Sequence, residues 1–96
     1  MAKGYWIANM EVPDPVRYGA YQRFVRPFLA ANGRFIVRGG TQDIVEGTAH
    51  SRTVVVEFES HEKALAVYRS HEYQEGMKHR LDAAATDLII VEGFEE

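Results

Sequence analysis

Two short runs in the second half of the chain, residues 54–56 (VVV) and 88–91 (LIIV), place apolar side chains at consecutive positions. Successive side chains of a β-strand point to opposite faces of its sheet, so each run would put apolar groups on both faces. A sheet with one face in water would instead alternate apolar and polar residues. Trp6 and Ile7 repeat the pattern near the start of the chain. The sequence therefore predicts a sheet that is covered on both faces.

The first half of the chain predicts a strand and then a helix. Residues 4–12 are rich in aromatic and β-branched side chains, which is typical of a strand. Asp14-Pro15 is a suitable helix start, because aspartate is a favoured N-cap and proline is tolerated in the first turn. Pro27 should kink this helix, and Asn32-Gly33 should end it. Its apolar face is formed at three- and four-residue spacing by Tyr21, Phe24, Val25, Phe28 and Leu29.

The second half predicts two strands, over residues 34–46 and 53–59, that are joined by the polar loop 47–52. Ser60 is expected to cap a helix that ends at Arg69, and Ser70 to restart it as far as about Ala85. A last strand is expected over residues 87–94. The order β-α-β-β-α-β predicts an α+β, ferredoxin-like protomer, in which a four-stranded antiparallel sheet carries its helices on one face. We expect residues 1–96 to form this single domain.

The helices can cover only one face of this sheet, so the other face needs a further cover. A second protomer is the simplest cover, and loops at the sheet edge are the alternative. With a loop at 47–52, residues 41–46 would pair with 53–58, which leaves residues 35–38 overhanging. An unpaired overhang invites pairing with another chain. We therefore expect Gly39-Gly40 to bend the strand toward a partner in a homodimer.

Composition excludes several classes of protein. The net charge of −3 and the lack of any Lys/Arg cluster disfavour nucleic-acid binding. The apolar runs are far shorter than the ~20 residues that span a bilayer, and the first twelve residues do not resemble a secretory signal. The chain has no cysteine, which excludes disulfides and thiol chemistry and suits a cytoplasmic protein. No membrane association and no cofactor are expected.

Several motifs in order resemble the domain-of-unknown-function family 1330, of the dimeric α+β barrel superfamily. The resemblance covers nearly the whole chain and rests on "KGYWIANMEVPDP", "GRFIVRGG", "VVVEFES" and "AVYRSHEYQ". It implies a ferredoxin-like protomer whose sheet faces that of a second protomer. Relatives in the superfamily include cofactor-independent monooxygenases, isomerases of small chlorinated or lactone substrates, and haem-degrading enzymes. Arg38 matches the family's "RGG", whereas Val67 replaces its usual tryptophan.

Aromatic and basic residues are the strongest candidates for a ligand site: Tyr18, Tyr21, Arg38, Tyr68, Tyr73 and Arg80. Tyrosine offers an apolar body with a polar tip, and arginine binds carboxylates through two parallel hydrogen bonds. Together they predict a pocket between helices and sheet for a small aromatic or carboxylate ligand. Glu57, within an apolar strand, could pair with an arginine or act as a base. In the alternative interpretation, the tyrosines are core residues and Arg38 forms an ion pair at an interface.

Metal and haem sites have weaker support. His71, Glu75 and His79 follow at four-residue spacing on one helix face, but three residues across two turns converge poorly on one ion. A haem protein would need an axial histidine in the pocket, and the histidines appear in peripheral segments. Haem or metal binding is therefore the less favoured function, and two other functions have stronger support. The first is ligand binding with cofactor-independent acid–base or oxygen chemistry, and the second is a non-catalytic ligand-binding or structural protein.

Overall fold

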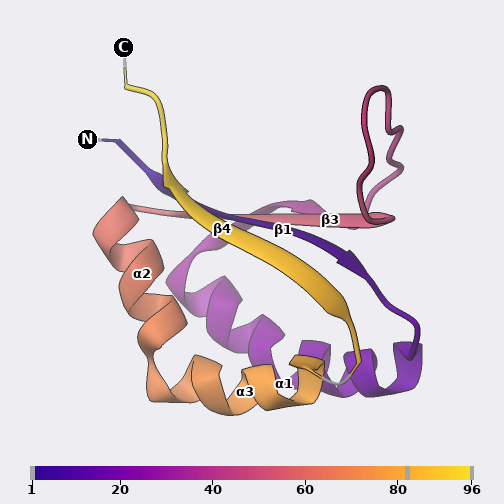
Figure 1. Ribbon diagram of the computed structural model, residues 1–96. Coiled ribbons are helices and arrows are strands. Elements are labelled where there is room, and N and C mark those ends of the chain that lie inside the picture. The colour runs from indigo at the N-terminus through magenta and orange to yellow at the C-terminus, as the bar shows by residue number, and fades with distance from the viewer. Residues whose placement is uncertain (1, 82, 96) are drawn as a thin grey trace.

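The computed structural model describes residues 2–81 and 83–95, and it has the expected ferredoxin-like α+β fold. Its sheet has the order β2-β3-β1-β4, and the pairs of neighbouring strands run antiparallel. All of the helices lie on one face of this sheet (Figure 1). The elements are β1 (Gly4–Glu11), α1 (Pro15–Asn32), β2 (Arg34–Arg38), β3 (Arg52–Phe58), α2 (His61–Arg69), α3 (His71–Leu81) and β4 (Ala85–Glu92).

The helices begin at the predicted caps. The Asp14 carboxylate accepts a hydrogen bond from the Arg17 amide at 3.1 Å, and Ser60 Oγ accepts one from the Lys63 amide at 3.0 Å. Ser70 separates α2 from α3, because its Oγ donates to Val67 O at 2.6 Å and accepts from the Tyr73 amide at 3.2 Å. Pro27 lies within α1 without interrupting it. Gly33 ends α1 in an extended conformation, packed against the carbonyl of Glu57.

Three predicted boundaries were too late, namely the end of the last helix and both ends of the last strand. The helix that follows Ser70 ends at Leu81 rather than near Ala85, and the last strand runs from Ala85 to Glu92 rather than from 87 to 94. Residues 83–85 are three alanines, which are good helix formers. Strand pairing decides the outcome, since Ala85 is the partner of Glu11 in β1. Tertiary contacts therefore override the local helix propensity.

The predicted register of the central hairpin was wrong. Residues 34–38 pair with β3 in the same sheet, with Phe35 opposite Val56 and Arg38 opposite Val54, so they do not overhang. A β-bulge lies between Phe35 and Val37. Gly39 has a φ of +69°, the left-handed region that glycine favours, and there the chain leaves the sheet. Residues 41–46 form no strand.

The segment from Gly39 to Ser51 is a loop that stands off the sheet on the side away from the helices (Figure 1). Polar contacts fasten its base to β1. Asn9 Oδ1 accepts from the His50 amide at 2.7 Å, and Asn9 Nδ2 donates to His50 O at 3.1 Å. Gln42 Nε2 also donates to His50 O at 2.7 Å. These hydrogen bonds replace the strand pairing that the sequence suggested for this segment.

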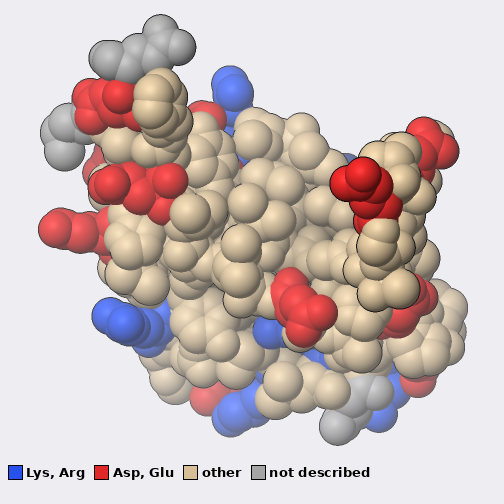
Figure 2. Space-filling view, turned by 45° about the horizontal axis from the view of Figure 1, so that its top comes forward, with Lys and Arg blue, Asp and Glu red and all other residues tan. Residues whose placement is uncertain are grey.

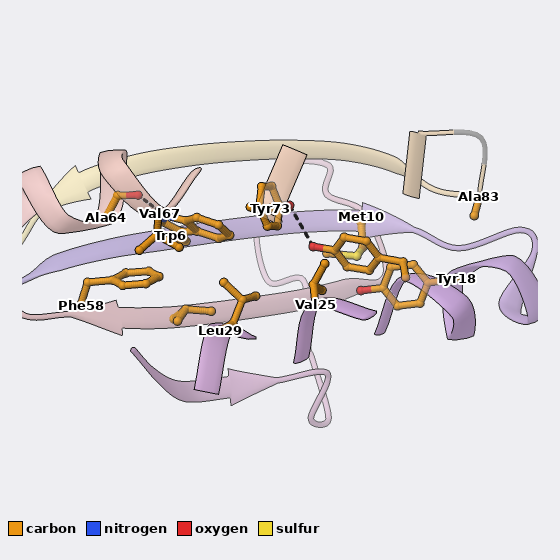
Figure 3. Packing of buried hydrophobic residues seen from close by; sticks show 12 residues of the cluster. Trp6, Met10, Tyr18, Val25, Leu29, Phe58, Ala64, Val67, Tyr73 and Ala83 are labelled. Atoms are coloured by element: carbon orange, nitrogen blue, oxygen red, sulfur yellow. Dashed lines mark hydrogen bonds between the residues drawn. The ribbon is translucent and has the colours of Figure 1, made fainter. Parts of the chain in front are cut away.

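The core lies between the sheet and the helices. Trp6 is at its centre, where its ring packs edge-on against Tyr73 and its Nε1 donates to Ala64 O at 2.8 Å (Figure 3). Tyr73, Phe58 and Val56 are its largest fully buried side chains. The helices α1, α2 and α3 form one layer that covers this core from one side.

The opposite face of the sheet carries an apolar row along its middle, which this chain leaves partly exposed. Strand register aligns one row of β-branched residues across all four strands: Val37, Val55, Ile7 and Ile89. Val37 is 41% exposed and Ile89 is 58% exposed. Figure 2 shows that uncharged surface covers the middle of this side and that acidic side chains lie around it. A cover for this face would have to come from outside the chain.

Candidate functional site

A pocket lies between α1 and the helix-facing side of the sheet, with a cavity of about 50 Å³. That is room for a few water molecules or one small organic group. Strand register explains the space, because the small side chains of Ala8 and Val54 lie side by side in the middle of the floor. Tyr18, Tyr21 and Val25 of α1 form the roof. Figure 3 shows Tyr18 and Val25 on this helix above the sheet.

The sheet carries the polar groups of the pocket at its margins. One row across the strands runs from Arg38 through Val54 and Ala8 to Leu88. The next row runs from Arg52 through Met10 to Thr86. The arginines therefore lie at the β2–β3 side, and the threonine lies at the β4 side. The apolar side chains between them form the floor.

Four arginines line this pocket, namely Arg26, Arg38, Arg52 and Arg80. Arg26 and Arg38 are exposed at its mouth, whereas Arg80 is only 7% exposed. None of the four forms an ion pair with a carboxylate of the described residues; the ion pairs of these residues lie elsewhere, for example between Arg34 and Glu57. Arginine stays protonated in proteins, and a buried cation is normally paired. The pocket is therefore electropositive.

Aromatic rings contact three of these guanidinium groups, and that of Arg38 lies 5.5 Å from the centre of the Phe35 ring. The guanidinium carbon of Arg80 lies 5.7 Å from the centre of the Tyr21 ring, and that of Arg52 lies 5.7 Å from the centre of the Tyr18 ring. The two tyrosine rings stack on each other with their centres 5.5 Å apart. Such cation–π contacts position the cations without neutralising them. Their charge remains available to a ligand.

The Tyr21 and Tyr73 hydroxyls form a buried hydrogen bond of 2.9 Å (Figure 3). Burial raises the pKa of Tyr21 far above its usual value, and the neighbouring Tyr73 raises it further. Burial also raises the pKa of Tyr73, although the Arg80 guanidinium beside it has the opposite effect. Both phenols therefore stay protonated at neutral pH. They are proton donors rather than bases in this site.

The raised pKa values predict a loss of stability at alkaline pH. The unfolded chain releases its tyrosine protons near pH 10, whereas the folded protein keeps those of Tyr21 and Tyr73. Their contribution is complete below pH 10 and falls as the pH rises, by about 1.4 kcal/mol per pH unit for each phenol. Urea unfolding between pH 9 and 11 should show a shallower decline for Tyr21→Phe than for the wild type. Equal declines would contradict the prediction.

Five of the residues singled out from the sequence line the pocket together: Tyr18, Tyr21, Arg38, Tyr73 and Arg80. Tyr68 lies beside it rather than in it, since its ring packs on Trp6 and Tyr73 and its hydroxyl donates to Met77 Sδ at 3.5 Å.

Glu57 lies on the other face of the sheet. It follows Val56 and precedes Phe58, which both face the helices, so the alternation of the strand directs it away from the pocket. Its carboxylate accepts a hydrogen bond from the Tyr5 hydroxyl at 3.2 Å and lies 3.8 Å from Arg34 Nε. Of the two roles that the sequence left open for Glu57, pairing with an arginine and acting as a base, the structure shows the pairing.

Sequence reasoning missed Gln22, Arg26, Arg52 and Thr86, which also line the pocket. The sequence could have indicated Gln22 and Arg26, because they follow Tyr18 at four-residue spacing and share its face of α1. It could also have indicated Arg52, because this residue alternates with Val54 and Val56 and therefore shares their face of the strand. Nothing in the sequence indicated Thr86, because its position in the pocket depends on the pairing of β4 with Met10 of β1.

The histidines lie away from the pocket, and none of the four lines it. His71 Nε2 is 4.0 Å from Glu75 Oε1, while the His79 ring packs against Phe24 at 5.6 Å between centres. Within residues 2–81 and 83–95, no group of three or more His, Asp or Glu side chains comes together to hold a metal ion. Within the same ranges, no helix combines the length and apolar character needed to cross a bilayer.

The fold and the pocket together define the class of this protein: a ferredoxin-like α+β protein with an electropositive, aromatic pocket between helix and sheet. The chain belongs to the family described as Domain of unknown function (DUF1330), whose model matches residues 3–94. No curated protein matches the chain.

Solved structures share the fold. A protein of unknown function from Rhodopseudomonas palustris is 21% identical, with a TM-score of 0.73 over 99% of this chain and 85% of that one. SnoaB, a cofactor-independent oxygenase from Streptomyces nogalater, is 7% identical, with a TM-score of 0.66 over 100% and 97% of the two chains. A dimeric ferredoxin-like protein of unknown function from Thermobifida fusca is 15% identical, with a TM-score of 0.60 over 95% and 89%. At these identities the likeness concerns the fold.

Proposed function

We propose that this protein binds a small organic anion, an aromatic or carboxylate compound, in the pocket between α1 and the sheet. The observation that carries the proposal is the group of four pocket-lining arginines without a carboxylate partner among the described residues. A pocket with aromatic walls and unpaired cations suits a ligand that has an apolar body and a negative group.

The same pocket supports cofactor-independent acid–base or oxygen chemistry. The protonated Tyr21–Tyr73 pair could donate a hydrogen bond to an oxygen on which negative charge develops, and Arg80 beside it could stabilise that charge. SnoaB shows that the fold is compatible with an oxygenase that uses no cofactor. The second candidate is a non-catalytic ligand-binding protein. Oxygen consumption and product analysis with a bound aromatic acid would separate the two.

We also propose that the protein is a homodimer in which the exposed sheet faces pack together. The apolar row across the four strands would form the centre of the contact. The loop at residues 39–51 stands on the same side and exposes Ile44 and Val45, which are 48% and 87% exposed. A stable interface buries about 1,600 Å² in total, which the sheet face and this loop could provide together. The Thermobifida fusca protein is a dimer of the same fold.

Ligand binding can be tested with two arginines of one strand. Arg34 and Arg38 both belong to β2, but Arg34 lies beside Glu57 on the far face and Arg38 lines the pocket. Arg38→Met should weaken the binding of benzoate or phenylacetate about tenfold or more, because a hydrogen bond to a charged group contributes roughly 1.5–3 kcal/mol. Arg34→Met is the matched control and should bind as the wild type does.

Isothermal titration of both variants with benzoate, phenylacetate and pyruvate would measure this difference. Sedimentation of the same samples would show whether the oligomer is intact. The site assignment is wrong if Arg38→Met dissociates the dimer while its affinity for these acids equals that of Arg34→Met. The alternative interpretation of Arg38, an interface ion pair, predicts that result.

A further inference from the structure

Two buried polar side-chain atoms have no hydrogen-bond partner among the described residues: Arg52 Nε and Thr86 Oγ1. Both residues line the pocket. Other buried polar groups of this region are paired, such as the Trp6 indole with Ala64 and the two tyrosine hydroxyls with each other. Folded proteins pair nearly all of their buried donors and acceptors. Two unpaired groups on residues that line one pocket therefore indicate a partner that the described residues do not supply.

The sheet register places these two residues in one row. Arg52 and Thr86 are the pairing partners of Met10 on its two sides, so their strands flank β1. Strands two apart in a sheet are separated by roughly 10 Å. Between them lies the Met10 side chain, which is 3% exposed and carries no hydrogen-bond donor. The row therefore has two polar ends and an apolar middle, with the Tyr18 ring beside Arg52.

The two ends differ in chemistry. Arg52 Nε–H is a donor on a cation, with Arg38 near the same edge of the floor, so this end suits a carboxylate. The Thr86 hydroxyl can donate or accept, and it lies at the β4 side of the floor, across from Arg38 and Arg52, so this end suits a neutral hydroxyl or carbonyl oxygen. A flat apolar body would span the middle. A ring that carries a carboxylate and, across from it, a hydroxyl has this arrangement.

On the basis of the proposed function, we infer that Arg52 and Thr86 bind the two ends of a small aromatic hydroxy acid. Arg52 binds the carboxylate, and Thr86 selects the ligand by bonding the hydroxyl oxygen at its other end. Thr86 is thereby a specificity-determining residue, and Arg52 is the anchor. The four arginines explain why the ligand is an anion, whereas the row from Arg52 to Thr86 explains which second group it carries.

Titration of 4-hydroxybenzoate, benzoate and phenol tests this assignment. The wild type should bind 4-hydroxybenzoate several-fold to tenfold more tightly than benzoate. Thr86→Val, which keeps the shape and removes the hydroxyl, should bind both acids with equal affinity, at the wild-type value for benzoate. Thr86→Ser should restore the preference. Arg52→Met should weaken both acids at least tenfold and leave phenol unaffected, whereas Arg34→Met should change none of the three.

The melting temperatures of the variants provide a second test that needs no ligand. Removal of an unpaired buried hydroxyl should leave the melting temperature of Thr86→Val equal to that of the wild type or raise it. If Arg52→Met does not fold, Arg52→Lys keeps the charge without the Nε–H group and should still weaken the acids. A preference for 4-hydroxybenzoate that persists in Thr86→Val, or acid affinities that persist in Arg52→Met, would overturn the inference.

These failures are distinct from failure of the proposed function. Suppose that benzoate binds the wild type, that Arg38→Met weakens this binding, and that the Arg52 and Thr86 variants bind normally. The ligand site is then correct, but Arg52 Nε and Thr86 Oγ1 are hydrogen-bonded by water only, which overturns this inference. If none of the three compounds binds the wild type, the aromatic hydroxy acid is overturned. If phenylacetate and pyruvate also do not bind the wild type, the proposed function is overturned.

Discussion

Ile89→Asp is expected to convert a dimer into a monomer. Ile89 lies at the β4 end of the apolar row, on the sheet face that this chain leaves uncovered, and it is 58% exposed. In a twofold dimer each residue occurs twice, so the substitution would bury two carboxylates without partners. An uncompensated buried charge costs about 3–5 kcal/mol, which corresponds to more than a hundredfold in the dimer dissociation constant.

Leu81→Asp provides the matched control for this substitution. Leu81 is 59% exposed, nearly the same as Ile89, but it lies at the end of α3 on the helical side of the molecule. Sedimentation velocity at micromolar concentration should show a dimer for the wild type and for Leu81→Asp, and a monomer for Ile89→Asp. A wild-type monomer, or a dimer that survives Ile89→Asp, would show that the sheet face is not the interface.

Gly76→Ala is expected to destabilise the fold and to displace the pocket wall. A Cβ at Gly76 would lie 2.3 Å from Val25 Cγ1 and 2.8 Å from Phe24 Cδ1, so α3 would have to move away from α1. Tyr73 and Arg80 lie one turn on either side of Gly76 in α3, and they would move with it. The substitution should therefore weaken the Tyr21–Tyr73 hydrogen bond and the binding of any acid that the pocket holds.

The other helical glycine isolates the steric effect. Gly19 lies within α1, and a Cβ there would meet only the flexible Arg23 side chain, at 3.4 Å. Both substitutions gain helix propensity, so their difference reports the overpacking at Gly76, about 1–3 kcal/mol. For a domain of this size, each kcal/mol corresponds to roughly 4–8 °C in melting temperature. Gly19→Ala should melt at or above the wild-type temperature, and similar melting of both variants would refute the close packing of α1 on α3.

Local patterns in the sequence were sufficient for much of this fold. Asp14, Ser60 and Ser70 fix helix starts, because a cap is a contact between residues three apart in the chain. The apolar runs indicated that both sheet faces carry apolar residues, because side-chain direction alternates along any strand. The residue types Tyr and Arg also indicated the chemistry of the pocket. Five of the residues chosen on that basis line it.

Tertiary structure alone decided what depends on register. The sequence could not show that Arg38 pairs opposite Val54, because a strand can slip along its partner without any change in its own composition. The chain leaves the sheet at Gly39, which follows β2 with a φ of +69°, and residues 39–51 form a loop. The pairing of β1 with β3 and β4 aligns Arg52 and Thr86 on either side of Met10. Patterns along the chain reveal which residues can recognise an anion, whereas only the pairing of distant strands determines which of them meet.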